Sequence, residues 1–360
     1  HRPGPGRDGV GRTTRPFRSR PTSRRDGRSG HGADVLSGRR AVIPCSEDAR
    51  DAGEPLAGTA PLASAWIVIE QPGPWGRDAL ADSHLPADVA QHLAGAKPHG
   101  VSVLLARHPD RPERTGRSAR HVWVARSVAG GHLLRHGVLD ELGVITTWDL
   151  AGIGAGSLPA IGAMDAAPVT FVCTHSGRDR CCAVHGRALI TGLLADVEPP
   201  ARERIWECSH IGGHRFAPVM LTLPSGSVHG RLDGPLAREV VERSLRHEVE
   251  VGTLRGQSGF VPPFQVAVIE VMRATGSTSD DLFDALLVTE GRAVPLRPGR
   301  PLDEALSVVE AEVRHRDGTA WRVVLERHPL DRLRLESCDK EPVAGHRWEV
   351  ASLMPSQAWG

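Results

Sequence analysis

Short apolar runs separated by polar loops dominate the chain from about residue 41 to residue 285. Three runs have apolar side chains on both faces, as buried strands do: Ala65–Glu70, Val101–Ala106 and His121–Ser127. Pro86–Ala94 has apolar residues at helical spacing. Strands that alternate with short helices predict an α/β fold. We expect Ala151–Ala163, rich in Gly and Ala, to be a loop or linker.

The middle of the chain continues this alternation. The predicted elements are a strand at Pro168–Cys173, a helix at Ala183–Ala195, a short strand at Arg204–Cys208 and a hairpin of Pro218–Leu223 with Ser227–Leu232. The sequence Pro224-Ser225-Gly226 supplies the turn of the hairpin. Asp233 is placed to cap a helix over Pro235–His247. This order is compatible with a thioredoxin-like domain, although the pattern alone does not single that fold out.

In the last third of the chain the alternation of strands and short helices ends. Residues 248–285 are predicted to be helical, and the pattern after Gly291 becomes strand-like. Two apolar runs flank Asp317-Gly318, which is a strong signal for a two-residue hairpin turn. We therefore predict four regions. They are a disordered tail at 1–40, an α/β region at 41–165, a thioredoxin-like ferredoxin domain with a helical extension at 166–285, and a small β-rich module at 286–360.

Composition limits the classes of function. The first 40 residues are Arg, Gly, Pro and Ser with few apolar side chains, so they cannot bury enough surface to order themselves. The net charge of +1 gives no field that favours nucleic acid. No apolar run is long enough for a transmembrane helix. Six cysteines in this pattern favour reduced thiols with metal or redox chemistry, and hence a cytoplasmic location.

Phe171–Phe216 concentrates the candidate chemistry. It holds four cysteines and four histidines: Cys173, Cys181, Cys182, Cys208, His175, His185, His210 and His214. Two spacings stand out, Cys173-x8-Cys182 and His210-x3-His214, the second around two glycines. Thiolates and imidazoles are ligands for Fe–S clusters, Zn and Cu. A C-x-x-C redox motif and a G-x-S-x-G elbow are both missing, so neither a thiol–disulfide oxidoreductase nor a hydrolase is favoured.

The motifs CTHSGRDRCC at 173–182 and HIGGH at 210–214 resemble those of the sucrase/ferredoxin-like family, as do EPLAGTAP at 54–61 and EQPGPWGRDAL at 70–80. The resemblance covers about Pro44 to Gln265. It implies a [2Fe–2S] cluster with Cys173 and Cys182 on one iron and His210 and His214 on the other. It also implies electron transfer between redox partners that the sequence does not identify, and no glycosidase activity.

Ligand charge sets a direction for the potential of such a cluster. Four thiolates would leave a net charge of about −2, whereas two thiolates and two neutral imidazoles leave about zero. The less negative centre accepts an electron more readily. Because imidazole also has a second nitrogen that titrates, we expect reduction to be coupled to protonation at His210 or His214.

Several alternatives stay open at this point. Cys181 could replace Cys182 as a ligand, or be a buried inert thiol. We expect Cys208 to face away from His210, and we interpret Cys45 and Cys338 as structural. Two Cys and two His could instead hold a structural Zn in a non-redox binding module, although x8 is loose for that class. A cluster that serves as a redox or iron sensor is the third possibility.

Overall fold

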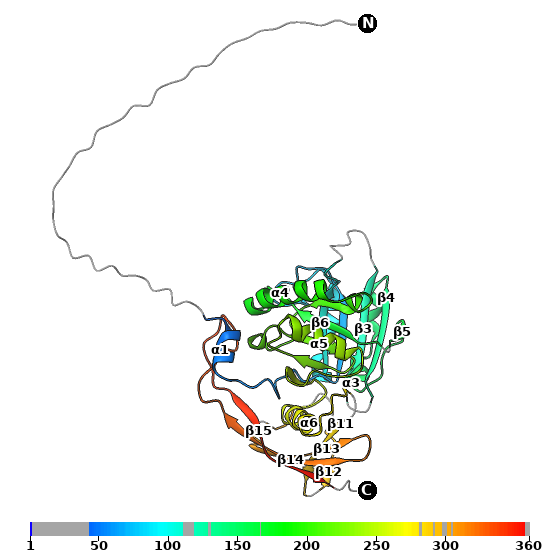
Figure 1. The fold of residues 1–360 in the computed structure, drawn as a ribbon. Helices are drawn as coiled ribbons and strands as arrows, with labels where there is room; N and C mark the ends of the chain where they lie inside the picture. Colours follow the sequence, from blue (N-terminus) through cyan, green and yellow to red (C-terminus); the bar gives the residue numbers. More distant parts are fainter. Residues whose placement is uncertain are drawn as a thin grey trace, which may run out of the picture. The chain divides into compact units, whose positions relative to one another are not determined.

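The computed structural model describes residue 1 and residues 43–110, 119–128, 131–165, 167–280, 283–290, 292–296, 301–303 and 305–356. The predicted tail at 1–40 lies outside these residues, apart from His1. The described elements form a mixed α/β structure with one large curled sheet and one small antiparallel sheet (Figure 1). This agrees with the predicted α/β class, while the thioredoxin-like assignment stays a prediction.

The large sheet has ten strands in the order β10-β9-β8-β6-β7-β2-β1-β3-β4-β5. Their bounds are β1 Ala65–Glu70, β2 Val101–Arg107, β3 Arg120–Arg126, β4 Leu133–Leu139, β5 Ala163–Met164, β6 Val169–Cys173, β7 Ile205–Cys208, β8 Met220–Leu223, β9 Ser227–His229 and β10 Leu254–Gln257. The pairs β1–β2 and β6–β7 are parallel, and the other pairs are antiparallel. Strands from both sides of residue 165 therefore share one sheet, joined where β2 pairs with β7.

Alternation of side chains divides this sheet into two faces. Trp66 and Val68 of β1 pack into an inner apolar cluster that also contains Phe171 and Cys173 of β6. Ile67, between the first two, lies in a second cluster on the outer face. The outer face is covered by α2 (Ala87–Ala94), α3 (Leu150–Gly154), α4 (Arg180–Asp196) and α5 (Gly234–Ser244). The curl of the sheet thus encloses the inner cluster, and Cys173 lies at one end of it.

The small sheet has five strands in the order β12-β11-β13-β14-β15. They are β11 Phe283–Thr289, β12 Arg292–Val294, β13 Val308–His315, β14 Ala320–Pro329 and β15 His346–Ser356. Helix α6 (Pro262–Thr275) packs its apolar side chains against this sheet (Figure 1). Gly318, with φ of 90°, makes the predicted turn between β13 and β14, so both the β-rich module and its central hairpin are confirmed.

Two predictions of local structure were wrong in part. The segment Ala151–Ala163 is not a loop throughout, because α3 starts at Leu150 and runs to Gly154. Residues 248–285 are not all helical, because β10 precedes α6. The sequence of β10, LRGQ, has little β-propensity, and its pairing with β9 decides its conformation.

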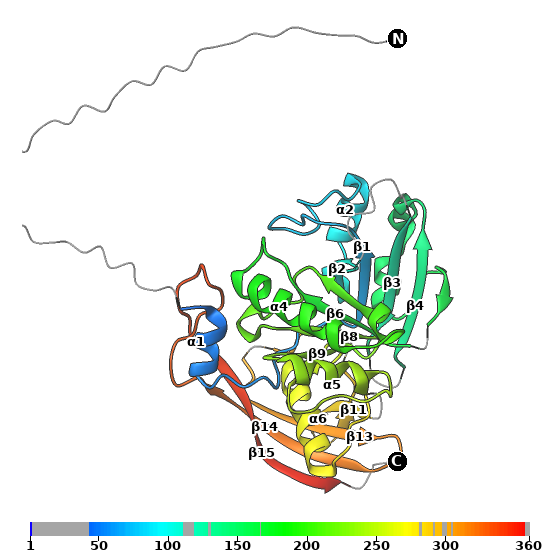
Figure 2. The same cartoon turned by 45° about the horizontal axis from the view of Figure 1, so that its top comes forward.

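Helix α1 (Cys45–Asp51) lies beside the connection between β14 and β15 (Figures 1 and 2). The backbone N–H of Leu335 in that connection donates to Oδ2 of Asp48 at 2.8 Å. The guanidinium of Arg332 donates to the Asp48 carbonyl at 2.7 Å. These bonds attach the C-terminal module to the start of the described chain, next to the first turn of α4.

Candidate metal centre

The two halves of the CTHSGRDRCC motif lie on different elements. Cys173 is the last residue of β6, and Asp179 caps α4 by accepting a hydrogen bond from the N–H of Cys181 at 2.8 Å. The helix begins at Arg180, three residues before the predicted start, so Cys181 and Cys182 both lie in its first turn. Thiolates are stabilised there by the positive end of the helix dipole.

The structure brings Cys173, Cys182 and His210 together. Their ligand atoms lie within 4.8 Å of one another. Nδ1 of His210 is 3.9 Å from Sγ of Cys173 and 3.9 Å from Sγ of Cys182. Both thiols are buried, while His210 is half-buried. A donor set of two thiols and one imidazole, drawn from a strand end, a helix and a loop, is well suited to a soft or borderline metal ion.

Each thiol of this group shifts the pKa of the other. The pKa of Cys173 is held well below its usual range, chiefly because the Cys182 thiol donates a hydrogen bond to it, with burial opposing and His210 assisting. The pKa of Cys182 is correspondingly raised by that bond and by burial. The backbone N–H of His175 also donates to the Cys173 sulfur. Ionisation is therefore favoured at Cys173 over Cys182.

His214 lies next to this group but is directed elsewhere. Its ring centroid is 5.1 Å from that of His210. Its Nδ1 lies 3.0 Å from Oδ2 of Asp179, out of line for a hydrogen bond. The described structure therefore assembles three of the four predicted ligands, and Nε2 of His214 is the ring nitrogen that Asp179 does not contact.

Arg255 of β10 supports the turn that separates the two histidines. Its side chain is buried, with 1% exposure, and burial lowers the pKa of its guanidinium to about 9. Nη1 donates to the Gly212 carbonyl at 2.9 Å, and Nε donates to Oγ1 of Thr59 at 3.0 Å. Gly213 has φ of 72°, and a Cβ there would collide with this guanidinium. Sequence reasoning missed Arg255, since a single arginine in a strand gives no signal.

The remaining cysteine, histidine and arginine residues near the proposed ligands differ in burial and in their contacts. Cys208 was expected to face away, and this was wrong: it pairs in register with Cys173 and lies in the same inner cluster, where burial raises its thiol pKa. His175 is buried in the loop after β6, with a ring nitrogen 2.7 Å from the Gly76 carbonyl oxygen. Arg178 and Arg180 are exposed, whereas Arg215 pairs with the buried Glu54 at 2.9 Å.

A second group of thiols lies on the other side of Asp179. It consists of Cys45, Cys181, Cys338 and the Asp179 carboxylate, whose ligand atoms lie within 4.8 Å of one another. Hydrogen bonds from Cys45, and more weakly from Ser46 and Cys338, lower the pKa of Cys181 to about 5 although burial opposes this. Sequence reasoning did not detect this group, because Cys45 and Cys338 are each more than 130 residues from Cys181.

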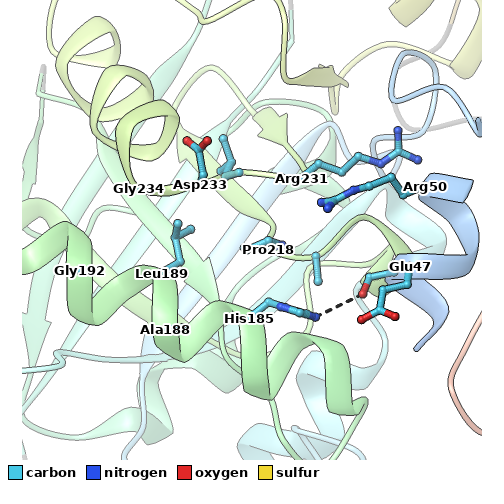
Figure 3. A pocket seen from close by; sticks show the side chains of 13 residues that line it. Glu47, Arg50, His185, Ala188, Leu189, Gly192, Pro218, Arg231, Asp233 and Gly234 are labelled. Atoms are coloured by element: carbon cyan, nitrogen blue, oxygen red, sulfur yellow. Dashed lines mark hydrogen bonds between the residues drawn. The ribbon is translucent and has the colours of Figure 1, made fainter. Parts of the chain in front are cut away.

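A cavity of ≈ 700 Å³ opens beside this second group (Figure 3). Its lining includes Glu47, Arg50 and Arg231 as well as Ser46 and His185, so groups of both charges face it. The Ser46 hydroxyl is 3.4 Å from Nε2 of His185 and donates to Sγ of Cys181 at 3.3 Å. Ser46 thus lies between the cavity and the thiol group.

Residues 56–256 match the family model of sucrase/ferredoxin-like proteins. The chain belongs to this family. The matched segment covers more than half of the chain and contains both halves of the Cys/His motif, which confirms the resemblance found in the sequence. No curated protein and no solved structure matched the chain.

The donor chemistry of both groups fits a bound metal ion. Each contains at least two buried sulfur atoms and a nitrogen or oxygen donor within a few ångströms, and thiolates clustered in this way are typical metal ligands. Among the residues that the structure describes, no helix combines the length and apolar character that crossing a bilayer requires.

Proposed function

We propose that this sucrase/ferredoxin-like protein is a one-electron carrier with a [2Fe–2S] cluster bound by Cys173, Cys182, His210 and His214. The observation that carries the proposal is the buried Cys173–Cys182–His210 group, which forms at the family's own motif. His214, whose ring centroid lies 5.1 Å from that of His210, would be the fourth ligand. The clustered free thiols favour the reducing cytoplasm as its location.

When bound, such a cluster accepts and releases single electrons. The chain's contribution is the environment of the ligands. The inner apolar cluster excludes water from Cys173, and the His175 N–H donates to its sulfur. The buried Arg255 adds a positive charge close by. Hydrogen bonds to sulfur and nearby cations both stabilise added negative charge, so each favours a higher potential.

The loop after β6 offers a place for a redox partner to approach. Thr174, His175, Ser176 and Gly177 line a cavity of ≈ 320 Å³, and the backbone of this loop contacts the Cys173 sulfur. Ser176 is exposed. We expect Ser176→Trp to slow reduction by a protein donor while leaving the visible spectrum unchanged. Ser307→Trp, on an exposed bend of the C-terminal module, is the control. Equal rates for the two variants would place docking elsewhere.

Visible and EPR spectra of anaerobically purified protein test the cofactor itself. The cluster predicts a red-brown protein with about two iron and two acid-labile sulfide ions per chain. Dithionite bleaches its absorbance. Exchange of either histidine by cysteine adds a thiolate charge, so His210→Cys and His214→Cys should retain a cluster and lower its potential by about 100–350 mV each. Unchanged spectrum and potential in both variants would exclude the histidines as ligands.

Proton coupling is a separate part of the proposal. If an imidazole ligand takes up a proton on reduction, the midpoint potential falls by about 59 mV per pH unit in the coupled range, as for any transfer of one proton with one electron. Potentiometric titration between pH 6 and pH 9 measures this slope. A flat midpoint over that range would remove proton coupling but leave the electron carrier intact.

A Zn-stabilised, non-redox module is the second candidate, favoured by one observation. The 3.9 Å separations from His210 to both sulfur atoms place all three donors around one point, as a single tetrahedral ion requires. A colourless protein with stoichiometric Zn that is lost in Cys173→Ser would support this candidate against the cluster.

A further inference from the structure

The second thiol group is assembled from three segments that lie far apart in the chain. Cys45 begins α1, Cys181 lies in the first turn of α4, and Cys338 lies in the connection between β14 and β15. The Sγ–Sγ distances are 3.5 Å for Cys45–Cys181, 3.3 Å for Cys181–Cys338 and 3.6 Å for Cys338–Cys45. The three sulfur atoms therefore form a nearly equilateral triangle.

The Asp179 carboxylate closes this triangle into a tetrahedron. Its Oδ1 is 3.9 Å from Sγ of Cys45 and 3.5 Å from Sγ of Cys338. A tetrahedral Zn²⁺ with Zn–S of about 2.3 Å and Zn–O of about 2.0 Å needs S–S edges of about 3.8 Å and S–O edges of about 3.5 Å. The edges in the structure lie within about 0.5 Å of these values.

Other groups hold the four donors in this arrangement. Oδ2 of Asp179 accepts hydrogen bonds from the Ser337 hydroxyl at 3.1 Å and from the backbone N–H of Cys338 at 3.2 Å. The buried Ser46 hydroxyl donates to the Cys181 sulfur at 3.3 Å. Such hydrogen bonds to ligand atoms orient a metal site.

Three of the four ligand residues are closed off from solvent. Cys45 is 0%, Cys181 2% and Asp179 3% exposed, and Cys338 is half-buried. A closed set of four protein ligands is typical of structural rather than catalytic zinc, because no position remains for water or substrate.

We infer that Cys45, Cys181, Cys338 and Asp179 bind one structural Zn²⁺, at a site distinct from the Cys173–Cys182–His210 group. On binding, those of the three thiols that are still protonated release their protons to solvent, and the ionised carboxylate supplies the fourth bond. The ion ties helix α1, helix α4 and the C-terminal module together. It shares no donor atom with the proposed electron carrier, so either assignment can fail without the other.

A disulfide is the rival chemistry for three adjacent thiols. All six cysteines are free in the structure, and the S–S separations far exceed the bond length of about 2.05 Å. A bond between any two of the three would leave the third thiol and the carboxylate without a shared ligand. A disulfide therefore accounts for the closeness of only two thiols, whereas a metal ion accounts for the closeness of all three thiols and the carboxylate.

Metal analysis and zinc X-ray absorption on the full-length protein test the inference. We expect about one Zn per chain that survives dialysis against EDTA. The absorption fine structure should show three sulfur atoms at about 2.3 Å and one oxygen at about 2.0–2.2 Å. Cys338→Ser should lower zinc content at least tenfold and leave the iron content unchanged. Cys208→Ala removes a buried thiol outside both groups and should keep the zinc.

Three results would overturn the site. One is unsubstituted protein, expressed with added zinc, that contains well under half an ion per chain. Another is zinc that persists in Cys338→Ser but disappears in Cys173→Ser, which would move it to the other group. The third is a disulfide among the three thiols in alkylated, unreduced protein by mass spectrometry. If Cys338→Ser does not fold, the fine structure of the unsubstituted protein decides by its sulfur count.

Discussion

Replacement of Gly213 by alanine tests how the turn between the two histidines is held. Gly213 has φ of 72°, and an added Cβ would collide with the Arg255 guanidinium. Gly276, at the end of α6, has the same φ of 72° with no atom within 4 Å of an added Cβ. Gly276→Ala therefore measures the backbone strain alone, which costs about 1 kcal/mol. The pair isolates the effect of the clash.

The expected cost of Gly213→Ala is larger because Arg255 must move. Displacement breaks at least one hydrogen bond of a buried charged group, such as that to the Gly212 carbonyl, at about 1.5–3 kcal/mol. Together with the strain, the loss of unfolding free energy is about 2.5–4 kcal/mol. The same shift moves His210 relative to His214, so we also expect metal content to fall.

Urea titrations of both variants and of the unsubstituted protein measure these differences, with iron per chain determined on the same samples. Gly276→Ala should keep its iron and shift the midpoint slightly. Equal midpoints and equal iron in the two alanine variants would refute the reasoning, because Arg255 would then move aside without cost.

Three further predictions concern other buried groups. Burial lowers the pKa of His229 to about 4, so as pH falls below 6.5 the unfolded chain binds a proton before the folded chain does. We therefore expect a loss of about 2 kcal/mol of unfolding free energy between pH 7 and pH 5, measured by urea unfolding. His229→Gln should remove this part of the pH dependence. The buried carboxylate of Glu54 contacts two guanidinium groups, so Glu54→Gln should lower the free energy of unfolding by about 3–5 kcal/mol in the same assay. The control, Glu349→Gln at an exposed carboxylate, should change it little. Similar losses in the two variants would argue against a stabilising role of the buried pairs. Cys182→Ser should abolish iron binding and Cys181→Ser should retain it, as iron analysis will show; the reverse result would make Cys181 the cluster ligand.

The sequence predicted the elements that are buried on both faces. The strand at Ala65–Glu70 has the predicted bounds, because a continuous apolar run leaves no other buried conformation of that length. The Asp233 cap and the hairpin around Gly226 were also predicted correctly, since both depend on local chemistry. The strand β10 was missed, because its four residues are buried through pairing with β9 rather than through their own propensity.

The candidate site likewise contains residues that local sequence could predict and residues that only the tertiary fold reveals. The spacings within a segment of 42 residues, together with the resemblance to the family's motifs, selected Cys173, Cys182 and His210, and the structure gathers these three. The partners of Cys181 could not be found in this way. Cys45 and Cys338 lie 136 and 157 residues from it, and only the tertiary fold brings segments so distant together. Arg255 was missed for the same reason, as it meets the glycine turn across the fold.

The pairing of β2 with β7 has a consequence for anyone who wishes to reduce the protein to a minimal unit. A truncated chain that began after residue 165 would retain the Cys/His motif but lose the neighbour of β7. The row of unpaired N–H and C=O groups along β7 would then be free to pair with other chains, which is a known route to aggregation. The cut would also uncover Trp206 and Cys208, which pack with β1 and β3 in the inner cluster. The smallest autonomous fragment that carries the motif must therefore include the strands that precede it. A shorter fragment cannot be cut out at the domain boundary that the sequence pattern suggests.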